Sequence, residues 1–355
     1  MKRTVFWVAA GGSFGGGHLA RSMSVARALP EGHESLVLVP SNALTADMAM
    51  RRGAPAHRTR LMHRWDEAEA LVQEVVTAGW EGRPDLLVTD RPDAISAGDL
   101  ARLRAAWPST KFAVIGNEEA GPLPVDLQVL PDPGFVLEAP GNEVWRAHPG
   151  QCIGGAAYCV LGRRFQRRAP RPLGKPPHLL VTTGRTDPTN LTLLFVSASS
   201  ALNVEFAATV VIGSGFVHED ALPAIQDAAD SRFHFVRSTD NLEPLMGESD
   251  LALCAFGITL QELAAVSVPA LSVCHISEDV YYGRRMAALG FMRFAGYGGA
   301  MRPAQLRDEL RHLLASPRVL EGMAAAGPKH IDGRGAERVA LALAALVEER
   351  QAAVS

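Results

Sequence analysis

A glycine-rich stretch near the N-terminus contains the residue best suited to chemistry. Residues 11–18 read Gly-Gly-Ser-Phe-Gly-Gly-Gly-His, follow the apolar run at 5–10 and lead into a helical pattern. Glycines let a backbone approach a ligand closely, and the free N–H groups of a helix's first turn attract anions. Because His18 stands at the start of that helix, the stretch predicts a nucleotide or nucleotide-sugar site with a titratable side chain beside it.

Two other interpretations of this stretch stay open from the segment alone. Gly15-x-Gly17-x-x-Ala20 fits the dinucleotide-binding fingerprint, which also needs an acidic residue at the end of the next strand. The next apolar run, at 36–39, ends in Pro-Ser-Asn instead, which weighs against a dinucleotide. The second alternative is a tight turn whose histidine only caps the helix.

Two later loops also have the composition of anion sites. In residues 182–192, either Asp187 or Thr189 can cap the following helix, and the backbone amides can then hold an anion. Residues 255–263 run from a strand end into a helix with Glu262 near its first turn. That glutamate can accept hydrogen bonds from ribose hydroxyls, or it can simply interact with the helix dipole.

The composition excludes several functional classes. A chain of 355 residues that is 47% hydrophobic and 21% charged can bury two ordinary cores. Its net charge of -3, with no run of lysine and arginine typical of nucleic-acid binding, predicts no nucleic-acid partner. No segment approaches the roughly 20 apolar residues of a membrane span, and the four cysteines lack metal-type spacing. We expect a cytoplasmic protein with small-molecule partners and no membrane insertion.

Short apolar runs alternate with longer amphipathic ones in both halves, which predicts parallel sheets covered by helices. The expected strands are 4–10, 35–39, 85–89, 111–115 and 125–130, then 178–183, 206–212, 232–236, 250–254 and 270–274. A stretch rich in proline and charge at 163–177 predicts the linker. We therefore expect Rossmann-like domains at 1–165 and 166–335, a C-terminal helix at 336–355, and a ligand cleft at the carboxyl ends of the strands.

Five motifs follow one another along the chain. They are Gly17-His18 with Arg21, Gly184-Arg185-Thr186-Asp187 with Asn190-Leu191-Thr192, Asp240-Asn241-Leu242, Gly257 with Thr259 and Glu262, and the segment 331–339. In this order they resemble the nucleotide-sugar enzymes of the GT-B fold, specifically the UDP-sugar hydrolases of pseudaminic and legionaminic acid biosynthesis and the lipid II-forming N-acetylglucosaminyltransferase. The resemblance covers nearly the whole chain. It implies an α/β protein in which two Rossmann-like parallel-sheet domains face a central cleft.

The resemblance also implies that the C-terminal domain binds UDP. The implied nucleotide contacts are Gly184, Thr186, Val236, Thr239, Asn241, Gly257, Thr259 and Glu262. The sugar would project toward Gly17, His18 and Arg21, where an imidazole can act as general base. Attack from the side opposite UDP inverts the anomeric configuration. No Asp-x-Asp motif occurs in a suitable loop, so we expect catalysis without a metal or another cofactor.

Two departures from the family pattern bear on the reaction. The hydrolases have an Asp-His-Tyr triplet where this chain has Asp90-Arg91-Pro92-Asp93, and Arg185 replaces a glycine beside the expected diphosphate. A guanidinium pairs with phosphate or with a sugar carboxylate. Arg91 and Arg185 therefore make a uronic acid a candidate sugar. Glu118, Gln261 and His275 complete the set of expected sugar and acceptor contacts.

These features predict an inverting, metal-independent glycosyltransferase that moves a sugar from a UDP-sugar donor to a small-molecule acceptor, with His18 as the base. A cytosine-type base, as in nucleoside-antibiotic biosynthesis, is one acceptor that suits a charged donor. Two alternatives remain. The first is hydrolysis of a UDP-linked deoxyamino sugar, and the second is a non-catalytic protein that binds nucleotide sugars.

Overall fold

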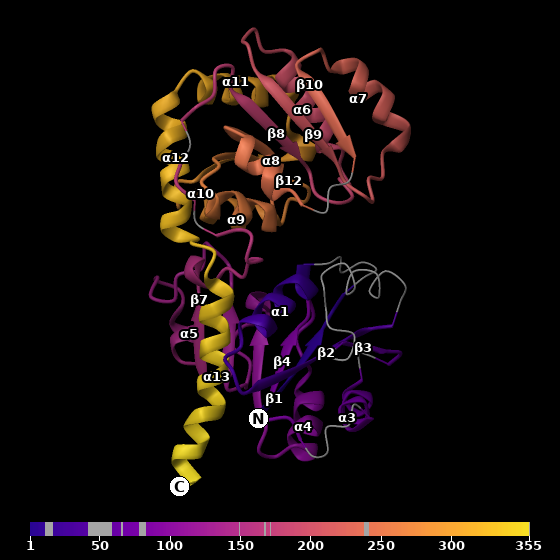
Figure 1. Cartoon of the computed structure of the whole chain (residues 1–355), viewed down its shortest axis with the longest axis vertical. Coiled ribbons are helices and arrows are strands. Elements are labelled where there is room, and N and C mark those ends of the chain that lie inside the picture. Colours follow the sequence, from indigo (N-terminus) through magenta and orange to yellow (C-terminus); the bar gives the residue numbers. More distant parts are fainter. Residues whose placement is uncertain are drawn as a thin grey trace. The chain divides into compact units, whose positions relative to one another are not determined.

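The computed structural model divides into two compact units, each with its own sheet (Figure 1). Unit 1 comprises Met1–Gly162 and Arg334–Ser355, and unit 2 comprises Arg163–Gly333. The structure describes residues 1–10, 17–41, 59–64, 67–77, 83–148, 150–166, 168–170, 172–237 and 241–354, with the backbone alone from 349 onward. The chain passes from one unit to the other twice.

Within the described residues, unit 1 contains a seven-stranded parallel sheet with the order β3-β2-β1-β4-β5-β6-β7. The strands are β1 (Lys2–Val8), β2 (His33–Pro40), β3 (Thr59–Met62), β4 (Leu86–Asp90), β5 (Lys111–Ile115), β6 (Leu127–Leu130) and β7 (Gln151–Gly154). Val5 of β1 lies opposite Leu36 of β2 and Leu87 of β4. Because β1 and β4 are neighbours, the segments that follow their carboxyl ends lie close together.

The alternation of side chains along β1 shows how this sheet is covered. Phe6 and Val8 belong to a buried cluster that includes residues of α1 (Gly17–Ala28) and α13 (Gly335–Val354). Val5 and Trp7 belong to a second cluster, which includes residues of α3 (Ala68–Thr77) and α4 (Ala97–Ala106). All four side chains are fully buried, as expected for a parallel strand between two helical layers. The shorter elements of unit 1 are η3 (Glu118–Ala120), α5 (Glu143–Arg146) and η4 (Ala156–Tyr158).

Helix α13 belongs to unit 1, although all of unit 2 precedes it in the chain. Val339, Leu343 and Val347 recur every four residues on this helix and are buried in the same cluster as Phe6. Two glycines near the point where the chain returns to unit 1 lie very close to backbone carbonyls from earlier in the chain. A Cβ on Gly333 would lie 2.2 Å from the Phe165 carbonyl oxygen, and one on Gly335 would lie 2.0 Å from the Cys159 carbonyl oxygen. Only glycine fits at these two positions.

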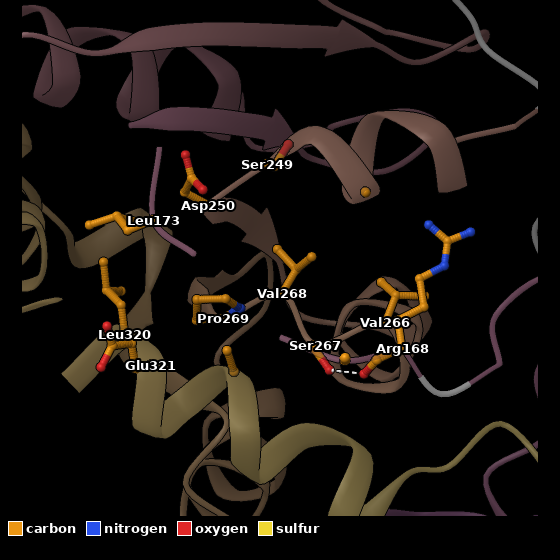
Figure 2. A pocket seen from close by; sticks show the side chains of 13 residues that line it. Arg168, Leu173, Ser249, Asp250, Val266, Ser267, Val268, Pro269, Leu320 and Glu321 are labelled. Atoms are coloured by element: carbon orange, nitrogen blue, oxygen red, sulfur yellow. Dashed lines mark hydrogen bonds between the residues drawn. The ribbon is translucent and has the colours of Figure 1, made fainter. Parts of the chain in front are cut away.

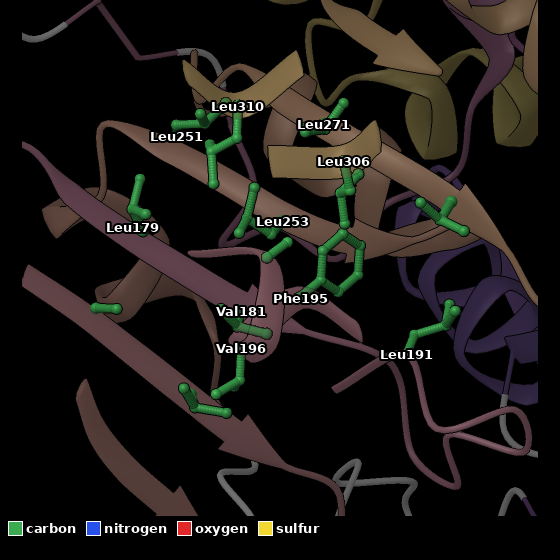
Figure 3. Close-up of a cluster of buried hydrophobic side chains, with 14 of the residues drawn as sticks. Leu179, Val181, Leu191, Phe195, Val196, Leu251, Leu253, Leu271, Leu306 and Leu310 are labelled. Carbon is green, nitrogen blue, oxygen red and sulfur yellow. The ribbon is translucent and has the colours of Figure 1, made fainter. Parts of the chain in front are cut away.

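Unit 2 contains, in its described part, a six-stranded parallel sheet with the order β10-β9-β8-β11-β12-β13. The strands are β8 (His178–Thr182), β9 (Ala207–Ile212), β10 (Phe233–Arg237), β11 (Leu251–Ala255), β12 (Ala270–Cys274) and β13 (Met292–Tyr297). The helices are α6 (Leu191–Ser200), η5 (Glu219–Ala221), α7 (Leu222–Ala228), α8 (Glu243–Glu248), α9 (Ile258–Ala265), α10 (Asp279–Ala287), η6 (Gly298–Ala300), α11 (Pro303–Leu314) and α12 (Pro317–His330). Figure 3 shows its core, where Leu179 and Val181 of β8 lie in one cluster with Phe195 of α6 and Leu306 of α11.

The strands predicted from apolar runs are confirmed in both units, with ends that agree to within two residues. The run at 4–10, for example, is observed as Lys2–Val8. Strands β3, β7 and β13 were not predicted, and each lies at an edge of its sheet. The predicted linker at 163–177 contains no helix or strand among its described residues. Among the helices that the structure describes, none has the length and apolar character needed to cross a membrane.

Candidate functional site

The carboxyl ends of β1 and β4 bring a histidine and an aspartate together in unit 1. His18 lies in the first turn of α1, and Asp90 is the last residue of β4. His18 Nδ1 lies 2.7 Å from Asp90 Oδ1. An ionised carboxylate only accepts hydrogen bonds, so Nδ1 carries the proton and donates it. In the neutral ring the lone pair is then on the other nitrogen, Nε2, which is the form that accepts a proton in general-base catalysis.

Asp90 is completely buried, and two more side chains of α1 hold its carboxylate. Arg21 Nε and Nη2 donate to the two oxygens at 3.0 and 2.5 Å, and the Ser22 hydroxyl donates at 2.9 Å. Burial alone would raise the pKa of this carboxyl, but the Arg21 charge and the hydrogen bonds from His18 and Arg21 outweigh burial and hold the pKa below its ordinary value. Asp90 is therefore ionised at neutral pH. Its ionised form stabilises the fold fully above about pH 4, and this stabilisation is lost as the pH falls through the lowered pKa.

The predicted glycine loop lies only partly within the described structure. Residues 11–16, including Gly15, are outside it. Gly17 begins α1 and is exposed, and no described atom lies within 4 Å of the position that a Cβ would take. Of the N-terminal motif, the structure therefore places Gly17, His18 and Arg21.

The segments that follow β4 and β5 are joined by a hydrogen bond at the same sheet edge as the His18–Asp90 pair. The Arg91 guanidinium lies 4.4 Å from the centre of the Trp7 ring, and its Nη2 donates to Asp93 at 2.6 Å. The Asn117 side chain, which follows β5, donates to the Arg91 carbonyl at 3.1 Å. Glu118 comes next, half-buried at the start of η3. Arg91 and Glu118 thus lie at the same sheet edge as His18, but the guanidinium of Arg91 is buried against the protein.

In unit 2, a buried aspartate shapes the loop between β8 and α6. Asp187 accepts hydrogen bonds from the backbone N–H groups of Leu191 and Thr192 at 2.7 and 2.9 Å, and from the Thr192 hydroxyl at 2.6 Å. Because that hydroxyl donates to Asp187, the Thr183 hydroxyl must be the donor in its 2.9 Å bond to Thr192. Asp187 has a left-handed φ of 48°, a conformation tolerated by aspartate and often found in functional loops. The N-cap residue of this helix is Asn190, whose side-chain oxygen accepts from the Leu193 N–H at 3.3 Å, rather than the predicted Asp187 or Thr189. Asp187 instead holds the first two N–H groups of the helix.

His275 fastens the same loop from the end of β12. Its Nε2 lies 3.1 Å from the Thr183 carbonyl oxygen, and its Nδ1 lies 2.8 Å from the Thr189 hydroxyl. A carbonyl can only accept, so Nε2 carries a proton and donates it to Thr183, while Nδ1 has the Thr189 hydroxyl as its partner. His275 was expected to contact the sugar, and in this structure both of its ring nitrogens are used to hold the loop.

The turn at 184–186 packs tightly against the segment after β9. The Arg185 and Thr186 carbonyls accept hydrogen bonds from the backbone N–H groups of Gly215 and Val217, at 3.1 and 3.0 Å. A Cβ on Gly213 would lie 2.2 Å from the Arg185 carbonyl oxygen. The turn residues 184–186 themselves remain exposed. Their backbone is thus fixed from behind, while their surface stays accessible.

Replacing Gly213 by alanine should therefore lower the stability of unit 2 by about 1–3 kcal/mol, because a backbone carbonyl must move to admit the methyl group. Gly215→Ala is the matched control, since its Cβ would meet the Thr186 methyl at 3.4 Å, which a side chain can accommodate. Urea unfolding followed by far-UV circular dichroism measures both variants. Equal stability of the two would contradict the tight packing at Gly213.

The remaining predicted nucleotide contacts lie on three further segments of unit 2. Gly257 has a φ of 154° and precedes α9, where Thr259, Gln261 and Glu262 are half-buried. Since β11 lies between β8 and β12, this helix start is at the same edge as the 183–192 loop. Val236 is half-buried on the edge strand β10, and Asn241 is exposed beyond it. Thr239 and Asp240 lie outside the described residues.

All four cysteines are free thiols. Burial raises the pKa of Cys254 to about 12 and that of Cys152 to about 11, the latter helped by Glu118. Thiols with such pKa values are protonated at neutral pH and are poor nucleophiles. Among the described residues, no three His, Cys, Asp or Glu side chains form a group that could hold a metal ion.

A cavity of about 290 Å³ lies at the opposite, amino edge of the unit 2 sheet (Figure 2). Asp250 and Pro269, which precede β11 and β12, line it together with Leu173 of the linker and Leu320 of α12. Asp250 accepts backbone hydrogen bonds from Gly174 and His178 at 3.1 and 2.7 Å, so its carboxylate holds the linker against the sheet. This cavity is separate from the candidate loops at the carboxyl edge.

Comparison with solved structures identifies the architecture. The chain is similar to MurG of Acinetobacter baumannii at 15% identity, with a TM-score of 0.69 over 97% of this chain and 99% of that one. It is similar to CalG4, the calicheamicin glycosyltransferase, at 17% identity, with a TM-score of 0.66 over 98% and 99% of the two chains. The chain has the GT-B fold. A third GT-B structure, Anabaena HepE in complex with UDP-glucose, is 12% identical, with a TM-score of 0.61 over 97% of this chain and 100% of that one.

Sequence comparison finds relatives that match only part of the chain. No protein-family model matches the chain. It is 25% identical over 203 residues to the spore coat polysaccharide biosynthesis protein SpsG of Bacillus subtilis, which is 55% of this chain and 58% of SpsG. It is also 25% identical over 122 residues to the uncharacterized protein MJ1062 of Methanocaldococcus jannaschii, 32% of this chain and 25% of that protein. The matched region thus spans little more than half of the first relative.

The residue that the sequence analysis did not select is Asp90. It was noted only as the start of a segment that departs from the family pattern, and 72 residues separate it from His18. One signal was present, because a carboxylate at the end of an otherwise apolar strand must be paired if it is buried. That signal does not show which residue pairs with Asp90, because the pairing depends on β1 and β4 being neighbours in the sheet.

Proposed function

We propose that this protein is an inverting glycosyltransferase that transfers a sugar from a UDP-sugar to a small acceptor, with His18 as the general base. The observation that carries the proposal is the hydrogen bond from His18 Nδ1 to the buried, ionised Asp90. It fixes one tautomer and leaves the Nε2 lone pair for a proton. The GT-B fold and a relative that takes part in polysaccharide biosynthesis are consistent with this activity.

The proposal assigns UDP to unit 2. The exposed turn at 184–186 and the helix start at 257–259 offer backbone N–H groups to a diphosphate. Glu262 would accept from the ribose hydroxyls, and Val236 and Asn241 would border the uracil. Anabaena HepE, which shares the fold, was crystallised with UDP-glucose, which supports this choice of donor.

In the proposed reaction, Nε2 of His18 takes the proton of the acceptor as the acceptor's oxygen or nitrogen attacks the anomeric carbon. The bond from that carbon to the diphosphate oxygen breaks on the opposite side, and UDP departs with the bonding electrons. Configuration at the anomeric carbon is therefore inverted. Asp90 stabilises the imidazolium that forms, and backbone dipoles offset the charge that develops on UDP.

A donor and acceptor screen tests this proposal. UDP release is measured with UDP-glucose, UDP-N-acetylglucosamine, UDP-glucuronate and a UDP-deoxyamino sugar, each with and without hydroxyl acceptors and cytosine. We expect release only when an acceptor is present. Rapid release without an acceptor would identify a UDP-sugar hydrolase instead, and UDP binding without release would identify a non-catalytic protein. We expect EDTA to leave the rate unchanged, and inhibition that magnesium reverses would contradict metal-independent catalysis.

Arg185 supports a more specific proposal, a uronic acid as the transferred sugar. Its side chain is exposed on the 184–186 turn, whereas the guanidinium of Arg91 is buried against Trp7 and Asp93. Arg185→Ala should therefore raise the KM for UDP-glucuronate by about tenfold. This change corresponds to the loss of a charge-assisted contact of roughly 1.4 kcal/mol. It should raise the KM for UDP-glucose less, because that sugar has no carboxylate. Equal effects on both donors would place Arg185 on the diphosphate.

A further inference from the structure

Arg21 occupies a position that the proposed base mechanism leaves unexplained. It lies three residues after His18 on α1, so both side chains are on one face of the helix. The family resemblance implied a contact with the sugar. Instead, two of its three guanidinium nitrogens donate to Asp90, Nε to Oδ2 and Nη2 to Oδ1.

The carboxylate of Asp90 has no capacity left for another donor. Oδ1 receives His18 and Arg21, and Oδ2 receives Arg21 and the Ser22 hydroxyl. A carboxylate offers about four lone-pair sites, so four donors fill it. The guanidinium fork fixes the plane of the carboxylate, and this plane determines where Oδ1 meets the imidazole.

The Arg21 guanidinium lies next to Gly116 and is largely shielded from solvent. Gly116, directly after β5, has a φ of 93°, and a Cβ there would lie 3.5 Å from Arg21 Nη2. The Arg21 side chain is 22% exposed and that of Asp90 is 0% exposed. The Arg21–Asp90 pair is therefore only weakly screened by solvent.

We infer that Arg21 is a positioning residue that orients Asp90 toward His18 and offsets its charge, so that the imidazole keeps its Nε2 lone pair under the conditions of the reaction. A carboxylate alone beside an imidazole favours the protonated ring, which cannot act as a base. With Arg21 present, the group of three side chains is neutral when the imidazole is neutral.

The other charged groups near the imidazole do not replace Arg21. Asp93 lies within electrostatic range of His18, but it forms an ion pair with Arg91 at 2.6 Å. Cys159 is within electrostatic range of Arg21, and burial raises the pKa of its thiol well above neutral pH, so it carries no charge. Among the described residues, Arg21 is therefore the cation in direct contact with the carboxylate that orients the base.

The inference rests on the proposed function, and its test has one readout that needs no turnover. Arg21→Gln removes the charge and should move the acid limb of the kcat/KM profile to higher pH by about one unit. The pH at which the His18 ring signals change in NMR spectra should move in the same direction. Arg21→Lys keeps the charge and should leave the acid limb in place, while kcat falls because the fork is lost. Arg27→Gln, an exposed arginine on the same helix, is the matched control.

A double variant provides a second test in case the single variant does not fold. Arg21→Gln combined with Asp90→Asn removes both buried charges and should return the NMR transition of His18 toward its wild-type pH. An unchanged transition in Arg21→Gln would overturn the inference whether or not the protein turns over a sugar. A profile that keeps its shape while KM for the donor rises would also overturn it, because Arg21 would then contact substrate. Absence of turnover in the wild type, by contrast, would count against the proposed function alone.

Discussion

Replacing His18 by alanine is expected to lower kcat by about 10²- to 10⁴-fold, the range typical of losing a general base. The ring interacts with the protein through Nδ1 and presents Nε2 as the proton acceptor, so its removal takes away the acceptor. The proposed UDP contacts are in unit 2, so Kd for UDP should change no more than a few-fold. Steady-state kinetics and calorimetric titration with UDP measure the two quantities separately.

Two companion variants sharpen this result. Asp90→Asn should also reduce kcat strongly, because an amide can donate to Nδ1 and turn the proton toward Nε2, which then has no lone pair. His63→Ala removes an exposed histidine of the same unit and should leave kcat unchanged. A His18→Ala enzyme with normal kcat would remove this residue from the mechanism, and a lower UDP affinity with unchanged kcat would make it a ligand contact.

The second large effect concerns the helix that completes unit 1. Leu343→Ala should lower the unfolding free energy of this unit by about 2–5 kcal/mol, the usual cost of such a cavity. Leu343 is fully buried on α13 in the cluster with Phe6. Leu341 lies two residues earlier on the same helix and is 60% exposed. Leu341→Ala, with the same chemical change, should alter stability by no more than about 0.5 kcal/mol.

Tryptophan fluorescence provides a selective readout for this experiment. All five tryptophans of the chain, at positions 7, 65, 80, 107 and 145, fall within unit 1. Urea unfolding followed by tryptophan emission thus reports on unit 1, whereas far-UV circular dichroism reports on both units. Leu343→Ala should shift the emission transition to lower urea. An unmoved emission transition, or an equal shift in Leu341→Ala, would show that α13 does not stabilise this core.

The sequence was most informative where strands are buried on both sides. The central strand β11 is a continuous apolar run and β1 ends in one, because helices cover both faces of a parallel sheet. The unpredicted strands β3, β7 and β13 are edge strands with one neighbour each. In β7 every side chain is at least partly exposed, so burial imposes little hydrophobic pattern on its four residues. Local sequence therefore carries a weak signal there.

Local sequence motifs predicted only part of the candidate site. His18 was found because glycines precede it and a helix follows. Its orientation by Asp90, and the engagement of Arg21 with that carboxylate, depend on strand order rather than on spacing in the sequence. The same holds for His275, which reaches the loop after β8 from the end of β12. Long-range pairing of this kind appears only once the sheets are assembled.

The return of the chain to unit 1 through α13 sets an order for folding during synthesis. Domains generally fold as units while the chain emerges from the ribosome, the N-terminal one first. Here, residues 163–333 of unit 2 are complete before the ribosome has made the helix that closes the core around Phe6. The later domain in the sequence is thus the first that can finish folding. Until α13 emerges, the apolar surface that this helix covers on the first sheet has no partner, and exposed surface of this kind is prone to aggregation.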